Sequence, residues 1–246
     1  MQHHKRLVLT FGLMVGMVMI LITISSAVPS RQRQWETRAI KTIDEDGGPI
    51  VDFQDVRTSD VREQTKRRLR GAKHDKSIWN VDPRDSSDNT VLVDFVDPNL
   101  PALPIAESST VLLGTITAAK AYLSNDLTGI YSEFSLQIEE VFKDSVQSSL
   151  AAGCTVEVTR EGGRVRFPSG HVHLYKISQL EMPRVGAKYL FFLTDGNADQ
   201  GFQILTAYEL RAGKIIPLDK LRQPQTYQNT NQTIFLSELR IKVANK

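Results

Sequence analysis

Two histidines, His171 and His173, come nearest in type and spacing to a metal site. They stand two positions apart in a segment predicted to be a strand, where alternation places them on one face. Neutral imidazole is the commonest metal ligand, but a structural zinc site needs about four ligands and a catalytic one about three plus water. The other candidates, His74 and Cys154, belong to unrelated segments. The pattern therefore favours histidines on a polar strand face, and neither a metal nor another cofactor is predicted.

The segment around these histidines, residues 160–176, also concentrates positive charge and aromatic rings. Cationic grooves with aromatic platforms bind single-stranded nucleic acid, but the N-terminal sequence described below directs the chain away from nucleic acid. An anionic polysaccharide, a lipid headgroup or an acidic protein surface is a more suitable ligand, although an ordinary surface of alternating charge is the favoured interpretation. The candidate binding residues are Arg160, Arg164, Arg166, His171, His173, Tyr175 and Lys176.

No catalytic constellation stands out elsewhere in the sequence. Alternation places Glu133 and Glu139 on the solvent side of a predicted strand, where carboxylates serve solubility. Ser169 stands in Pro-Ser-Gly rather than in the G-x-S-x-G turn of serine hydrolases. The one cysteine, Cys154, begins an alternating run and is expected to be a small buried hydrophobe. These observations leave the enzyme question open and favour a non-catalytic role.

The N-terminus reads as an export signal or a signal anchor. Lys5 and Arg6 precede an uncharged, mostly apolar run over residues 7–28, and a positive flank before such a run is typical of both. The run is long enough to span a hydrocarbon core of roughly 30 Å, which predicts an uncleaved anchor. The small residues at 25–27 suit signal peptidase and predict a cleaved signal instead. Either way, the positive-inside rule places the rest of the chain outside the cytoplasm.

Residues 30–88 read as a largely disordered linker. The segment is rich in Arg, Asp, Gln and Ser and offers too little apolar surface to offset the entropy of ordering. A short helix over residues 60–72 is compatible with the lack of proline and glycine before position 71. A basic cluster in it suits contact with anionic headgroups, but a solvated charged face is the favoured interpretation. The cluster consists of Lys66, Arg67, Arg68 and Arg70.

Residues 89–220 alternate in the manner of short β-strands. The clearest segment is 130–143, in which Phe134, Leu136 and Ile138 alternate with polar residues, as in a strand with one buried face. Gly114 predicts a bend in the preceding strand, and Gly162-Gly163 predicts a tight turn with positive φ. The predicted strands are residues 90–96, 110–123, 130–143, 154–161, 164–167, 171–177, 188–194, 202–209 and 214–217.

These short strands, joined by turns without long helices, predict an all-β domain built as a small antiparallel barrel or a sandwich. Long first strands that curl at an internal glycine favour the barrel, whose closure removes exposed edges. Apolar residues at helical spacing predict a short amphipathic helix over residues 233–243, packed on the barrel or offered to a partner. The expected organisation is a signal segment at 1–29, a linker at 30–88, the barrel at 89–220 and a tail at 221–246.

Several stretches resemble the β-barrel of a group of exported bacterial proteins of uncharacterised function. They are residues 111–116, the strand at 131–143 ending in Glu140-Val141-Phe142-Lys143, Gly162-Gly163, residues 186–193 and Tyr208-Glu209-Leu210. The arrangement is also similar to the OB-like barrel of the netrin-like domains, which include the tissue inhibitors of metalloproteinases. The resemblance covers residues 111–219 and implies an OB-like barrel. Those inhibitors depend on an N-terminal cysteine and several disulfides that this chain lacks, so protease inhibition is not implied.

These features together predict an exported protein, anchored in the cytoplasmic membrane by one N-terminal helix or secreted after signal cleavage. The leading expectation is a non-catalytic binding or interaction module of the cell envelope. Its partners would be the membrane, through the N-terminal segment, and an envelope protein or an anionic glycan or lipid. Nucleic acid is not expected, since the net charge is only +2. The alternatives are a metal-dependent or hydrolytic envelope enzyme and a structural envelope component.

Overall fold

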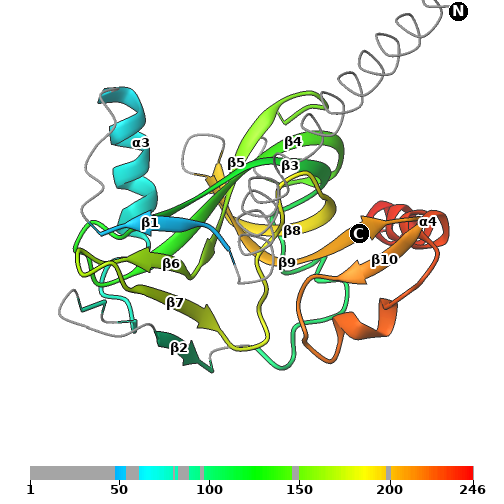
Figure 1. Ribbon diagram of the computed structural model, residues 1–246. Helices are drawn as coiled ribbons and strands as arrows, with labels where there is room; N and C mark the ends of the chain where they lie inside the picture. Colours follow the sequence, from blue (N-terminus) through cyan, green and yellow to red (C-terminus); the bar gives the residue numbers. More distant parts are fainter. Residues whose placement is uncertain are drawn as a thin grey trace, which may run out of the picture. The chain divides into compact units, whose positions relative to one another are not determined.

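The computed structural model describes residues 48–53, 61–79, 81–82, 89–94, 97–145, 150–197 and 201–245. The predicted signal segment at residues 7–28 lies outside these ranges. All described residues belong to one unit, Gly47–Lys246, and Figure 1 shows the helices and strands that they form. Within the described ranges, no helix combines the length and the apolar character needed to cross a bilayer.

The described residues are mainly β-structure, and they include two α-helices, α3 (Val61–Ala72) and α4 (Gln232–Ala244). The expectation of a predominantly β domain with a C-terminal helix is therefore confirmed. A short 3₁₀ helix, η1 (Pro224–Tyr227), precedes α4. The strands are β1 (Ile50–Asp52), β2 (Asn89–Val93), β3 (Thr110–Leu123), β4 (Ile130–Asp144), β5 (Thr155–Glu161), β6 (Gly163–Arg166), β7 (Val172–Ile177), β8 (Lys188–Asn197), β9 (Gly201–Arg211) and β10 (Lys214–Pro217).

The larger sheet has the strand order β10-β9-β5-β4-β3-β8, and β8 also pairs with β9. Its longest pairing is the predicted β3–β4 hairpin. In contrast, β5 and β9 run parallel and pair at only two positions, Val158 with Phe202 and Thr159 with Gln203. The sheets are not a closed barrel, which corrects the expectation of a small antiparallel barrel. The physical reason is that so short a parallel contact joins β5 and β9 along only part of their length.

The smaller sheet has the order β1-β6-β7-β2. β6 and β7 form an antiparallel hairpin, whereas β1 and β2 lie parallel to their neighbours at the two edges. The turn before β6 has Gly162 and Gly163 at φ values of +100° and +147°, as predicted. A Cβ atom on Gly162 would lie 2.6 Å from the carbonyl oxygen of Tyr175. The turn therefore requires glycine both for its conformation and for space.

The predicted bend in β3 is present at Gly114. The register of β3 against β4 shifts between Leu113 and Gly114, and a Cβ atom at Gly114 would collide with the carbonyl oxygen of Gln137. Such register shifts bend a strand and increase its local twist. The bend lets the long β3 pair with β4 along one edge and with β8 along the other.

Buried side chains join these elements. Leu136, Phe191 and Phe202 belong to a core cluster formed by strands of the larger sheet. A second cluster contains Phe235 and Leu239 of α4, which confirms that the C-terminal helix packs on the strands. Asn231 caps this helix by accepting hydrogen bonds from the backbone N–H groups of residues 233 and 234, so its start is defined by the sequence itself.

The described parts of residues 30–88 differ from the predicted linker. α3 covers almost the same residues as the short helix that the sequence allowed at 60–72, and β1 joins the smaller sheet. Val51 and Trp79 are buried in the core of that sheet. The Trp79 ring meets that of Tyr175 edge-on, with centroids 5.9 Å apart. A few well-placed apolar residues, including Val81, suffice here because β6 and β7 already present an apolar surface, which the composition of the segment does not reveal.

Candidate functional site

The predicted cationic segment folds into β5, β6 and β7, and its charges divide between two faces. Arg164 pairs with Leu174 and Arg166 with Val172 in the register of β6 and β7. Because side chains alternate along a strand, Arg164, Arg166 and Lys176 share the outward face of this hairpin. The side chain of Arg166 is half exposed and that of Lys176 about a quarter exposed. These three cations are the part of the predicted binding surface that reaches solvent together.

Three other candidate residues, Arg160, His173 and Tyr175, are buried. The same alternation that exposes Lys176 turns His173 and Tyr175 into the core of the smaller sheet. His173 meets Phe167 edge-on, with ring centroids 4.8 Å apart. Contrary to the sequence expectation, these residues are not part of one surface with the outward cations, because the second face of the hairpin packs against the rest of the domain.

The two histidines, His171 and His173, are not joined by further ligands. His171 is partly buried just before β7, whereas His173 is fully buried. In the ranges that the structure describes, no three His, Cys, Asp or Glu side chains gather to hold a metal ion. Cys154 is exposed, which makes the expectation of a buried thiol wrong. It directly follows a turn and precedes β5, so strand alternation does not extend to it.

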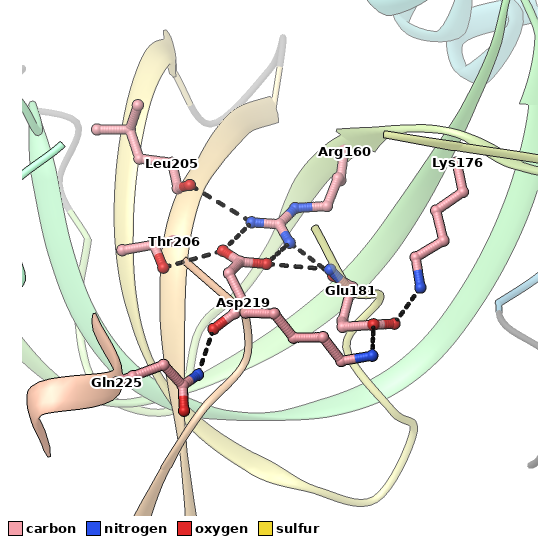
Figure 2. Close-up of polar contacts among 8 residues, drawn as sticks. Arg160, Lys176, Glu181, Leu205, Thr206, Asp219 and Gln225 are labelled. Carbon is pink, nitrogen blue, oxygen red and sulfur yellow. Dashed lines mark hydrogen bonds and ion pairs between the residues drawn. The ribbon is translucent and has the colours of Figure 1, made fainter. Parts of the chain in front are cut away.

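Arg160 forms a buried ion pair with Asp219, a residue that the sequence did not single out. Nη1 of Arg160 lies 2.6 Å from Oδ1 of Asp219, and Nη2 lies 3.0 Å from Oδ2. Arg160 is 2% exposed and Asp219 is 0% exposed. Figure 2 shows the carboxylate surrounded by further donors. Thr206 donates its hydroxyl proton to Oδ2 at 2.9 Å, and the backbone N–H of Glu181 donates to Oδ1 at 3.0 Å.

This buried pair connects to the surface through Glu181. Arg160 donates to the carbonyl oxygen of Glu181, while the carboxylate of Glu181 accepts from Lys176 at 2.6 Å and lies 2.7 Å from Nζ of Lys220. Figure 2 shows the ammonium group of Lys176 against this carboxylate. Burial raises the pKa of Glu181, but the two lysines outweigh it, and the pKa lies below its ordinary value. Glu181 therefore holds two cations side by side.

The outward cations of β6 are also held in place. Nε of Arg164 donates to the carbonyl oxygen of Gly48 at 2.9 Å, and Nη1 of Arg166 donates to Asp52 at 3.2 Å. Fixing long side chains in advance reduces the entropy lost when a ligand binds. We define the cationic face as the set of outward cations on β6, β7 and the segment after β10. It consists of Arg164, Arg166, Lys176 and Lys220.

A second buried ion pair attaches α3 to β4. Nε of Arg70 lies 2.6 Å from Oε1 of Glu133, and Nη2 lies 3.0 Å from Oε2. Nη2 also donates to Glu63 at 2.8 Å. Burial by itself lowers the pKa of Arg70, but the hydrogen bonds and negative charge of Glu133 and Glu63 outweigh it, and the pKa is raised. Glu133 was expected on the solvent side of its strand and is instead buried, because α3 covers that side.

A pocket of about 490 Å³ lies beside α4, away from the predicted binding residues. Its lining includes Leu103, Ile105 and Tyr227. The hydroxyl of Tyr227 donates to Glu238 at 2.9 Å, and Nζ of Lys242 lies 2.7 Å from the same carboxylate. Tyr227 and Lys242, which both line the pocket, are therefore engaged with Glu238.

No protein-family model matches this chain, and no curated protein shows significant sequence similarity to it. The candidate site therefore rests on the chain's own residues. Sequence reasoning identified Arg164, Arg166 and Lys176 but missed Lys220 and Glu181. No local sequence pattern marks either residue. Glu181 lies in the segment after β7 and Lys220 in the segment after β10, and both approach Lys176 only in the folded chain.

Proposed function

We propose that this chain is an exported protein of the cell envelope whose β domain is a non-catalytic interaction module. Residues 7–28 would either anchor it in the cytoplasmic membrane or be cleaved during secretion. The observation that carries the proposal is the cationic face: four cations arranged beside two carboxylates, Asp52 and Glu181, leave a net positive surface. Such a surface suits an acidic partner protein, and complementary charge speeds association and selects the partner.

The strand pairings support an OB-like assignment within this proposal. β3 pairs with β4, β4 with β5, β5 with β9, β9 with β8, and β8 with β3 again. OB-folds are five-stranded, partly open barrels that serve mainly as binding scaffolds. The short β5–β9 contact agrees with a partly open form. Fold alone does not assign function, so the cationic face remains the basis of the proposal.

The buried Arg160–Asp219 pair gives the cationic face its support. Asp219 holds the backbone of Glu181, and Glu181 orients Lys176 and Lys220. Interaction surfaces gain affinity when their contact groups are already oriented before the partner arrives. A role in partner binding therefore explains why the buried Arg160–Asp219 pair is connected through Glu181 to two lysines at the surface.

Site-specific cross-linking tests the proposal in the full chain. A benzophenone amino acid replaces Leu174, which lies on the outward side of β7, and replaces Ala118, an exposed residue of β3, in the matched control. We expect one specific protein adduct from position 174, absent from position 118. The combined change Arg164→Glu, Arg166→Glu and Lys220→Glu should remove it. Identical adducts at both positions, or an adduct that survives charge reversal, would contradict the proposal. If the chain is retained on an anionic polysaccharide and forms no protein adduct, the ligand of the cationic face is a glycan rather than a protein.

A further inference from the structure

α3 is oriented with its charged side inward. Arg70 and Gly71 are its buried residues, and Arg70 reaches Glu133 in the interior. Arg67 also turns toward the strands, with its guanidinium 5.4 Å from the ring centroid of Tyr122. A surface helix of a soluble domain normally places its apolar residues on the inner side. Here the inner side is attached through the Arg70–Glu133 ion pair and a cation–π contact.

The outer side of α3 carries an apolar stripe. Val61, Leu69 and Ala72 lie on one helix face at i, i+8 and i+11 spacing, and all are exposed. The polar Thr65 lies between them, and its hydroxyl donates to the carbonyl oxygen of Val61 at 2.9 Å. Val61 is 74% exposed and Leu69 is 49% exposed. Arg68 flanks this stripe and is itself exposed. The outer side of α3 therefore combines apolar side chains with a cationic border.

Neighbouring turns extend this apolar region. Asn125 in the β3–β4 turn donates to the carbonyl oxygen of Arg68 at 2.9 Å, and Asp126 accepts from the backbone N–H of Lys76 at 2.7 Å. Leu127, in the β3–β4 turn, is 46% exposed. Ile78, in the turn that follows α3, is 60% exposed. Leu127 has a φ of +62°, a conformation that is uncommon for a bulky residue and marks a turn held in a special shape.

We name these residues the α3 surface: Val61, Leu69, Ile78 and Leu127, with Arg68 and Lys76. The four apolar members are half of the eight large hydrophobic side chains that are exposed in the described ranges. Their concentration on one helix and the two turns beside it distinguishes this region from ordinary scattered exposure.

We propose that the α3 surface docks on a bilayer that contains anionic phospholipid. Amphipathic helices with apolar residues bordered by Lys and Arg lie in the membrane interface, where the apolar side chains enter the acyl boundary and the cations meet headgroups. The inference rests on the proposed membrane anchor. Residues 29–47 separate that anchor from the described domain, and a chain of this length spans at most about 70 Å when fully extended. With the anchor retained, the bilayer therefore lies within reach of the domain.

A depth measurement on the full chain in vesicles tests the docking. In a Cys154→Ser background, Leu69→Cys on α3 and Ile234→Cys on α4 each carry an environment-sensitive fluorophore. Ile234 is 64% exposed and serves as the matched control. The vesicles contain phosphatidylcholine alone or with one third phosphatidylglycerol, and nitroxide-labelled lipid acts as quencher. We expect a blue-shifted, quenched signal at position 69 in anionic vesicles only, reduced by Arg68→Glu, and no quenching at position 234.

Three outcomes would overturn the docking: no quenching at position 69, equal quenching in neutral and anionic vesicles, or equal quenching at positions 69 and 234. Ile78→Cys provides a second labelled position if the first variant folds poorly, as judged by circular dichroism. Resistance of the full chain to alkaline extraction from neutral vesicles reports the anchor independently. A chain that is extracted, but still floats with anionic vesicles, would refute the anchor and retain the α3 surface.

Discussion

Arg160 and Asp219 stand 59 positions apart in the chain and meet through two parallel hydrogen bonds, of 2.6 and 3.0 Å, in the interior of the domain. The pair links β5 to the segment after β10, and the carbonyl oxygen of Asp219 also accepts from Gln225 at 2.8 Å. A buried arginine–carboxylate pair depends on both partners, because either charge alone would remain desolvated and uncompensated.

Removing one partner of this pair should be strongly destabilising. For Asp219→Asn we expect a loss of about 3–5 kcal/mol in the free energy of unfolding, measured by urea denaturation. The matched control is Glu140→Gln, which breaks an exposed ion pair with Arg240 and should cost no more than about 1 kcal/mol. A similar loss in the two variants would show that the buried pair has no special role.

The attachment of α3 should depend on Arg70 rather than on its exposed neighbours. Arg70→Met leaves the carboxylate of Glu133 buried without its guanidinium partner, so α3 should detach more often. We expect faster amide hydrogen exchange over residues 61–72. Arg68→Met, two positions away on the exposed side, should leave that exchange unchanged. Equal protection of α3 in both variants would contradict this account of its attachment.

Asp126 should make stability depend on acid pH. Hydrogen bonds from the backbone N–H of Lys76, from the Ser124 hydroxyl and from Thr128 hold the pKa of Asp126 well below its usual value. A carboxylate whose folded pKa is depressed contributes stability that is complete above its unfolded pKa of about 4 and is lost as pH falls toward the folded value. Melting temperatures of Asp126→Asn and the natural chain should therefore differ at about pH 6, and the difference should narrow progressively as pH falls below about 4. A constant difference would refute the assignment.

The turn before β6 should tolerate alanine poorly for steric reasons. Gly162 and Gly153 both have positive φ, at +100° and +87°. Only at Gly162 would a Cβ atom meet nearby backbone, the carbonyl oxygen of Tyr175; at Gly153 nothing lies within 4 Å. Gly153→Ala should cost about 1–2 kcal/mol for the backbone conformation alone. Thermal unfolding should show a larger loss for Gly162→Ala, and equal losses would argue against the clash.

Cys154 should react as an exposed thiol in the folded protein. It is the one cysteine of the chain, and its side chain is exposed just before β5. An aromatic disulfide reagent should therefore label one thiol per chain at nearly the same rate in buffer and in denaturant. Protection that disappears only on unfolding would restore the expectation of a buried cysteine.

Local features were predictable because their signals are local. The alternation around Phe134 and Leu136, the turn at Gly162-Gly163 and the spacing of Phe235 and Leu239 each depend on residues close in sequence. The structure has the expected strands within a few residues of their predicted bounds, and α4 packs through its apolar residues. The outward cations of β6 and β7 follow from the same alternation, once the direction of the face is known.

What the sequence determined by itself is therefore the predominantly β class, the places where the chain turns, and a C-terminal helix. Tertiary structure alone decided that β1 and β2 join the smaller sheet in parallel, that the sheets do not close, and that Glu133 lies beneath α3. It also decided which cations face solvent and which, like Arg160, find a carboxylate inside. These outcomes depend on contacts between residues that are distant in the sequence. The free energies of those contacts are set by burial and pairing in the folded chain, and short-range periodicity does not determine them.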